Sequence, residues 1–136
     1  MSQLKVVLAY RLTKEKEKTV QEICRKQNIR LKSVTKAFYN QPLGFLAGIA
    51  GIKKQPGAFS GEDFPEEMLV FCGLTEEALD SFLTAYKETG VQTVALKAIV
   101  TPHNIFWDSV QLFEELRKER QKMRRNDIST NPSDSK

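Results

Sequence analysis

The feature that most constrains the fold is a pattern that occurs twice along the chain. Residues 4–52 and 66–125 each start with a short apolar segment, continue with an amphipathic helix and return to a strand. The two halves align with a constant shift of 62 residues and no gap, so that Thr13 falls on Thr75 and Asn28 falls on Gly90. The sequence therefore predicts an internal βαβ repeat within one domain of residues 1–125.

Start and stop signals define the elements of each half. Thr13 and Thr75 are of a residue type whose side chain caps helix N-termini. Asn28 and Gly90 tolerate the positive φ that is common just after the last residue of a helix. The strands are expected at residues 5–10, 29–35, 68–72 and 91–101, with further helices at 43–52 and from 109 to about 124.

Two sheets are compatible with two such units. One is the ferredoxin-like α+β fold, in which a four-stranded antiparallel sheet carries both crossover helices on one face. The other is a parallel, doubly wound sheet. The strands at 5–10 and 68–72 are the more apolar pair, and those at 29–35 and 91–101 carry lysines, which suits charged edges around an apolar centre. We therefore expect the ferredoxin-like pseudo-duplicate, with extra helices.

The last strand predicts how the two faces of the sheet are used. Val94, Leu96, Ala98 and Val100 alternate with Lys97 and are expected to meet the crossover helices. Because the opposite face is also apolar in every strand, the extra helices or a second subunit must cover it. A homodimer with two-fold symmetry is therefore one predicted assembly.

Several segments limit the setting of the protein. Residues 53–65 contain two prolines and two glycines and are expected to form a linker, and the polar residues 126–136 a disordered tail. The sequence contains no apolar run of about 20 residues and does not start with a typical export signal, so we expect a cytoplasmic protein without a membrane partner. Cys24 and Cys72 do not form a C-x-x-C pair.

A stretch near the C-terminus resembles a known family. The residues that carry the resemblance are Lys97, Ala98, Val100, Thr101, Pro102, Asn104, Trp107, Leu112, Glu115 and Leu116. Their pattern, KAxVTPxNxxW followed by Leu-x-x-Glu-Leu, is similar to that of a bacterial family known as domain of unknown function 3783. The resemblance covers roughly residues 68–119, implies a bacterial cytoplasmic protein, and supplies no reaction.

The same stretch supplies the candidate site. We expect Lys97, Thr101, His103, Asn104 and Trp107 to form a pocket for a small anionic ligand, because polar groups and an aromatic ring gather at a strand end. A structural alternative stays open for each of them: an edge-protecting lysine, a helix-entry turn and a core tryptophan. No cofactor or metal site is expected from one histidine and two separated cysteines.

These observations favour a ligand-binding or regulatory module over a catalyst. A nucleophile pair of Cys72 and His103 is conceivable at the ends of neighbouring strands, but no third orienting residue or acid–base set accompanies it, so the question of an enzyme stays open. The alternative is a nucleic-acid-associated protein, because residues 117–125 contain six Lys or Arg against one Glu. Such a run is equally typical of a solvated helix end.

Overall fold

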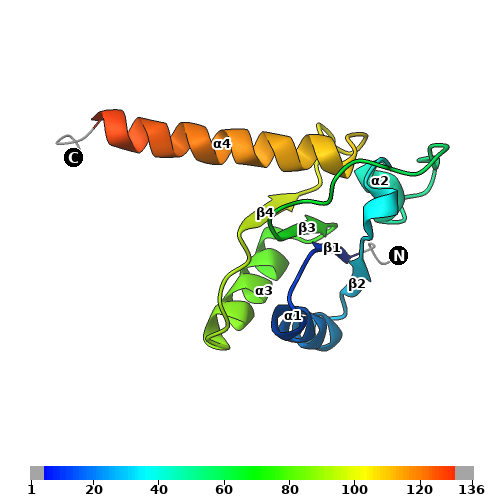
Figure 1. Ribbon diagram of the computed structural model, residues 1–136. Helices are drawn as coiled ribbons and strands as arrows, with labels where there is room; N and C mark the ends of the chain where they lie inside the picture. The colour runs from blue at the N-terminus through cyan, green and yellow to red at the C-terminus, as the bar shows by residue number, and fades with distance from the viewer. Residues whose placement is uncertain (1–4, 131–136) are drawn as a thin grey trace.

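The computed structural model describes residues 5–130, and side chains up to residue 123 (Figure 1). Its elements follow the βαβ order expected for each half, with two short helices after the second strand of the first half and one long helix after that of the second. In chain order they are β1 (Val6–Tyr10), α1 (Lys14–Lys26), β2 (Arg30–Ser33), η1 (Lys36–Phe38), α2 (Leu43–Leu46), β3 (Met68–Cys72), α3 (Glu76–Glu88), β4 (Leu96–Ile99) and α4 (Ser109–Thr130).

The four strands form one mixed sheet in the order β2-β1-β3-β4. β1 is parallel to β2 and β3 is parallel to β4, while the central pair β1 and β3 is antiparallel. The α+β class and the placing of β2 and β4 at the edges are confirmed, but the expectation of an entirely antiparallel sheet is wrong. The two strands of each unit are direct neighbours in the sheet: β1 pairs with β2, and β3 pairs with β4. The two units meet only at the central pair β1 and β3, so neither unit places a strand between the two strands of the other.

The two units have matching bounds over the first strand and the helix. A shift of 62 residues carries Val6–Tyr10 onto Met68–Cys72 and Lys14–Lys26 onto Glu76–Glu88. The match ends after the helix, because the shift would place the start of β4 at residue 92 and β4 starts at Leu96. The second unit therefore contains four extra residues before its edge strand, and the gap-free alignment of the sequence does not extend that far.

Local sequence explains the helices of both units. The side-chain oxygens of Thr13 and Thr75 accept hydrogen bonds from the amides of Lys16 (3.3 Å) and Ala78 (3.0 Å), which satisfies free N–H groups of the first turn. Asn28 and Gly90 follow the helices with φ of 58° and 77°. The start and stop signals predicted from the sequence are therefore confirmed.

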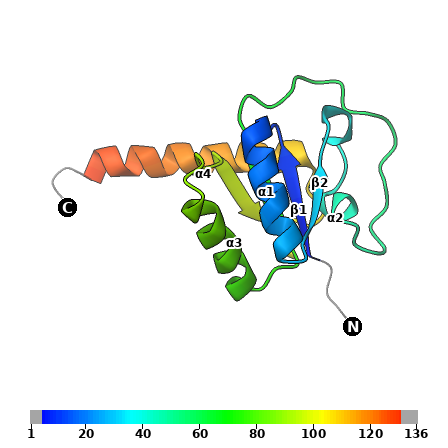
Figure 2. The ribbon, with the colours of Figure 1, turned by 90° about the horizontal axis from the view of Figure 1, so that it is seen from below.

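α1 and α3 lie side by side on one face of the sheet, which we call the α1/α3 face (Figure 2). Val20 and Phe82 are completely buried there against Val7 and Phe71 of the central strands. The Phe71 and Phe82 rings meet edge to face at 5.1 Å. Burial of a side chain of this size contributes about 1.5–3 kcal/mol, so these residues hold the helices on the sheet.

The opposite face, which we call the α4 face, is covered by α2, part of the linker and the first turns of α4. Leu96, Ala98 and Val100 lie on this side, so the expectation that they meet the crossover helices is wrong. The register explains the difference: Leu96 pairs with Met68, whose side chain lies on the α4 face. Of the four residues, only Val94 joins the α1/α3 face, and it precedes the strand.

Stacked aromatic rings close the α4 face. Phe64 of the linker lies between Tyr39 and Phe113, with ring centroids 4.1 Å and 4.2 Å away and nearly parallel planes. Tyr39 donates a hydrogen bond of 2.6 Å to the carboxylate of Asp63, which also accepts from the amide of Phe64 (2.8 Å). Because the chain covers this face itself, the face gives no reason to expect a second subunit on it.

The loops after β2 and β4 also meet on the α4 face. Leu43 and Gly44 donate backbone hydrogen bonds to the carbonyls of Trp107 (2.8 Å) and Ile105 (2.9 Å). A Cβ on Gly44 would overlap Ile52 and lie 2.9 Å from Cγ1 of Ile105. The glycine is therefore needed for this close approach of the two segments.

α4 extends well past the sheet beyond β4 (Figure 1). It reaches Thr130, so it includes the first residues of the tail expected from residue 126, and residues 131–136 lie outside the described part. None of the helices in the described range is long and apolar enough to span a membrane.

Asp63 makes the linker sensitive to pH. Burial alone would raise the pKa of Asp63, but the hydrogen bonds from Tyr39 and Phe64 and the charge of Arg11 outweigh it and lower the pKa. The carboxylate therefore stabilises the fold above about pH 4, and this contribution is lost as the pH falls through the lowered pKa. We expect Asp63→Asn to lower the free energy of unfolding at pH 7 and to have much less effect at pH 3, measured by urea denaturation. Glu62→Gln, at the exposed neighbour, is the control, and an equal loss at both pH values would contradict the assignment.

Candidate functional site

The turn after β4 is organised by the side chain of Asn104. Its Oδ1 accepts from the amide of Thr101 (2.8 Å), and its Nδ2 donates to the carbonyl of Ile99 (3.0 Å). These two groups belong to alternate residues of an edge strand, so the side-chain amide bonds them as a neighbouring strand would. Asn104 is buried, and it therefore closes the outer edge of the sheet where β4 ends.

Trp107 and His103 accompany this turn. Trp107 is half-buried against the α4 face, and its amide donates to the carbonyl of Asn104 (2.9 Å). The His103 ring is exposed and meets the Trp107 ring edge to face at 5.3 Å. Thr101, His103, Asn104 and Trp107 thus form one compact group, held by hydrogen bonds to each other and to the backbone and by the packing of Trp107 on the α4 face.

Lys97 is not part of that group. In the sheet it pairs with Leu69, whose side chain lies on the α1/α3 face, whereas Trp107 packs on the α4 face. The structure therefore brings together four of the five residues expected in the site and places the fifth on the other side of the sheet. Their roles in binding stay predictions.

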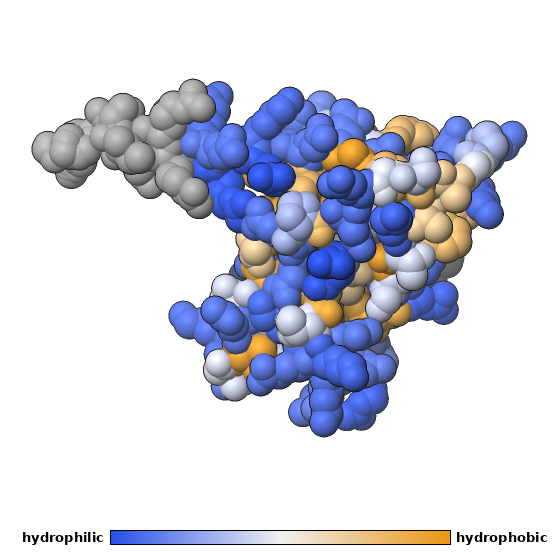
Figure 3. All heavy atoms as spheres, in the orientation of Figure 1, coloured by the Kyte–Doolittle hydropathy of each residue, from blue (hydrophilic) through white to orange (hydrophobic). Residues whose placement is uncertain are grey.

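An apolar opening lies beside Lys97, between α3 and β4. Its volume is about 280 Å³, slightly below the usual range of ligand pockets. Leu69 of β3 and Phe82, Leu83 and Tyr86 of α3 form most of the wall. Figure 3 shows that the molecular surface is indented between α3 and α4, with hydrophilic and hydrophobic residues both present around the indentation. We call this opening the Lys97 pocket; its other lining residues are Lys87, Thr93 and Val94.

The charged groups at the Lys97 pocket are cationic. The Lys97 ammonium group donates to the carbonyl of Val94 (3.1 Å), and Lys87 is the second exposed lysine of the lining. The hydroxyl of Tyr86 donates to the carbonyl of Gln92 (2.7 Å). Burial raises the pKa of Tyr86, with the carboxylates of Glu67 and Glu15 adding to the shift, so its phenol stays neutral. The lining of the pocket is almost entirely apolar, and the two charged side chains among its lining residues are both lysines.

The extra residues before β4 create this pocket. The sequence predicted a strand from residue 91, but Gln92, Thr93 and Val94 form an irregular segment along α3. Lys16 of α1 fixes the segment by donating to the carbonyl of Thr93 (3.2 Å), while it also pairs with Glu67 (2.6 Å). Sequence reasoning missed the pocket because it treated the two units as equal in length. Local propensity gave no signal of the change, because Thr93 and Val94 are both residues that favour strands.

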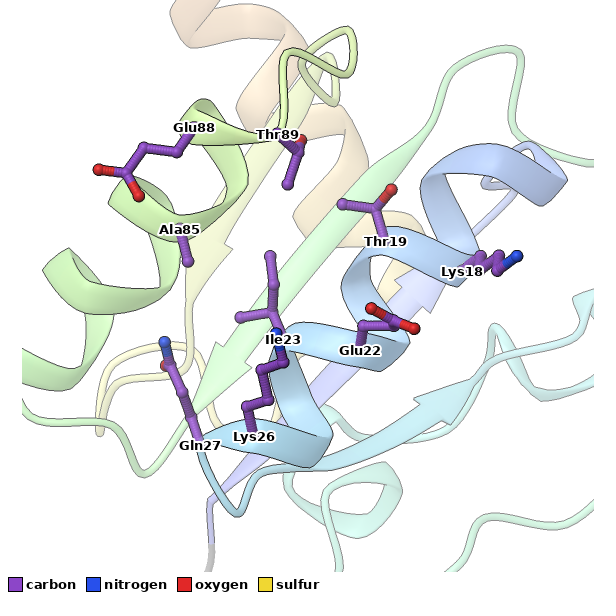
Figure 4. A pocket seen from close by; sticks show the side chains of 9 residues that line it. All are labelled: Lys18, Thr19, Glu22, Ile23, Lys26, Gln27, Ala85, Glu88 and Thr89. Atoms are coloured by element: carbon purple, nitrogen blue, oxygen red, sulfur yellow. The ribbon is translucent and has the colours of Figure 1, made fainter.

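A larger opening between α1 and α3 is less suited to a defined ligand. Its volume is about 620 Å³, and Figure 4 shows Ile23 and Ala85 between the helices, with Lys18 and Glu88 pointing outward. Glu22 and Lys26 add one charge of each sign to the walls. Charges of both signs on exposed helix surfaces are typical of a solvated groove.

Other chemistry considered from the sequence finds little support in the geometry. Cys72 is buried on the α4 face and burial raises its pKa, which keeps the thiol protonated and unreactive. Burial likewise raises the pKa of Cys24 to about 11. Across the described residues, no three His, Cys, Asp or Glu side chains gather in a way that could hold a metal ion.

The basic helix end is partly neutralised. Arg120 and Arg117 of α4 reach the carboxylate of Glu66, at 2.5 Å and 3.8 Å. The Arg117 guanidinium also lies 5.7 Å from the centre of the Phe113 ring. Two of the six cations of residues 117–125 therefore form ion pairs that hold α4 against Glu66, two residues before β3.

The role of Asn104 at the sheet edge can be tested by one substitution. Asn104→Asp keeps an acceptor for the Thr101 amide but removes the donor to the Ile99 carbonyl, and it places a charge in a buried position. We expect the free energy of unfolding to fall by about 1–3 kcal/mol in chemical denaturation. His103→Ala, in the same turn but exposed, should change it by less than about 0.5 kcal/mol. Stability unchanged by Asn104→Asp would show that the side chain does not hold the edge.

Comparison with known proteins bears on the second unit. Residues 67–123 match a family model described as Domain of unknown function (DUF3783). Neither curated proteins nor solved structures gave a match to the chain. The matched segment begins at the start of β3 and contains α3, β4, the Asn104 turn and every lining residue of the Lys97 pocket. The sequence resemblance is therefore confirmed: residues 67–123 form a DUF3783 segment.

Proposed function

We propose that the protein is a binding module whose Lys97 pocket takes a small ligand with an apolar body and one anionic group. The observation that carries the proposal is an apolar recess whose lining residues include two exposed lysines, Lys97 and Lys87, and no acidic residue. Apolar walls favour burial of a hydrocarbon or aromatic body by about 25 cal/mol per Å². An ammonium group at the edge then orients a carboxylate without the cost of burying it.

The setting of the pocket fits a binding role better than catalysis. Its polar groups are lysines, a neutral tyrosine and a threonine, and Lys97 is exposed to solvent. The side-chain hydrogen bonds of Lys97 and Tyr86 go to backbone carbonyls and not to a neighbouring acid or base, as a catalytic pair would require. A regulatory role would follow if occupancy alters the irregular segment at Gln92–Val94, which forms one wall.

The matching of the two units supports the further proposal that they are copies of one βαβ ancestor. The coinciding bounds of β1 with β3 and of α1 with α3, and the threonine caps, favour it. In this view the first unit retains the ancestral length, and the second unit acquired the extra residues that open a pocket beside its edge strand.

A binding experiment tests the proposed ligand class. Benzoate and hexanoate should raise the melting temperature and bind by calorimetry, whereas the uncharged benzyl alcohol and hexanol should bind more weakly. Lys97→Met keeps the apolar stem and removes the charge, so it should abolish the preference for the carboxylates. Leu83→Trp, which fills the recess, should weaken both classes of compound.

Lys118→Met is the matched control, because Lys118 is exposed on α4 and lies outside the pocket lining. It should leave carboxylate binding unchanged. Equal binding of acids and alcohols, or carboxylate binding that survives both pocket variants, would refute the proposed site.

A further inference from the structure

The charge of the chain is strongly polarised between its first unit and the residues that lie between that unit and α4. Residues 5–54 contain twelve Lys or Arg against three Glu, a net charge of +9. Residues 55–108 contain two Lys against nine Asp or Glu, a net charge of −7. The modest net charge of +4 hides this difference. The first unit therefore presents a cationic surface that the run at residues 117–125 does not account for.

Part of this surface lies on α1. Lys14 and Arg25 are exposed and lie three helical turns apart, so they share one side of the helix. Glu17, one turn from Lys14, accepts a hydrogen bond of 3.1 Å from the Ser33 hydroxyl of β2. The side that carries Lys14 and Arg25 is therefore turned toward the β2 edge of the sheet, away from α3.

The edge strand and the segments after it continue the surface. Arg30 on β2 and Lys36 on η1 are exposed, and so is Lys54 of the linker. The Lys54 ammonium group lies 5.8 Å from the centre of the Phe38 ring, and 41% of Phe38 is exposed. We call this surface the β2 basic edge; its members are Lys14, Arg25, Arg30, Lys36, Phe38 and Lys54.

Among the residues that the structure describes, no cation of the β2 basic edge forms an ion pair. The ion pairs found among the described residues involve Arg11, Lys16, Arg117, Lys118 and Arg120, none of which belongs to this edge. By contrast, Arg117 and Arg120 share Glu66. The first unit therefore offers more unpaired cations to an external polyanion than the described part of α4 does.

We propose that the β2 basic edge binds single-stranded nucleic acid. Its cations extend along a sheet edge and adjoining segments, which suits an extended phosphate backbone, and counterion release would drive binding. Phe38, exposed between lysines, offers a face on which a base can stack. This site is distinct from the Lys97 pocket, which lies at the opposite edge of the sheet.

Fluorescence anisotropy with labelled rU20 and dT20 tests the proposal, using the full chain at 50 and 200 mM salt. Lys36→Gln/Lys54→Gln removes two charges from the edge, and Lys118→Gln/Lys122→Gln removes two from α4. We expect the edge variant to lose at least about fivefold in affinity at 50 mM salt. The slope of log affinity against log salt concentration should become less steep by about 1.4, because each of the two lost phosphate contacts contributes about 0.7 for a single strand. The α4 variant should lose less than about twofold. Phe38→Ala should weaken binding without changing the slope.

The outcomes separate the sources of binding. Similar affinity for rU20 and dT20 fits recognition of backbone and base faces, and a preference for rU20 assigns the edge to RNA. Equal losses in the two charge variants would overturn the proposal, because net charge alone would then explain the binding. Absence of oligonucleotide binding at 50 mM salt would overturn it too, as would binding to vesicles of anionic phospholipid in place of either oligonucleotide.

Discussion

The structure depends on covering a four-stranded sheet that is apolar on both faces. One face is covered by two equivalent helices, α1 and α3, one from each unit. The other has no such pair, and it is closed by the insertion of Phe64 between Tyr39 and Phe113. This stack joins the linker, the loop after β2 and α4, which are far apart in sequence. Without it, the apolar side chains of β1 and β3 on that face would be exposed to water.

The two edges of the sheet have different uses because the two units end differently. β4 is closed at its end by the amide of Asn104, and the irregular segment before it leaves an apolar recess beside Lys97. β2 has neither feature and is surrounded by cations of its own unit. A small apolar anion at one edge and a polyanion at the other are both consistent with the charges present. The shared architecture thus supports two chemically different surfaces, separated by the width of the sheet.

Much of this fold follows from local sequence, and the rest depends on tertiary contacts. Thr13, Asn28, Thr75 and Gly90 fix the helix ends by capping and positive φ, which a sequence reveals directly. Strand direction was harder than strand order, because the apolar pattern of β1 and β3 identifies them as central strands but does not fix the directions of their neighbours.

The candidate site was predictable only in part. The residues from Thr101 to Trp107 were recognised as a turn with polar groups, and the turn is there. The bonding of Asn104 to the strand edge depends on geometry that spacing does not show. The sequence also could not separate Lys97 from Trp107, because the face occupied by β4 is set by its pairing of Leu96 with Met68. The start of that strand was expected several residues too early.

The central claim is that the Lys97 pocket, and not the Asn104 turn, receives the ligand. Amide chemical shifts of the ¹⁵N-labelled protein, followed during a titration with benzoate, test it most directly. The account predicts saturable shifts at Leu69, Leu83, Tyr86, Val94 and Lys97, with His103 and Trp107 unchanged. Shifts centred on the turn from Thr101 to Trp107, or none that saturate, would contradict it.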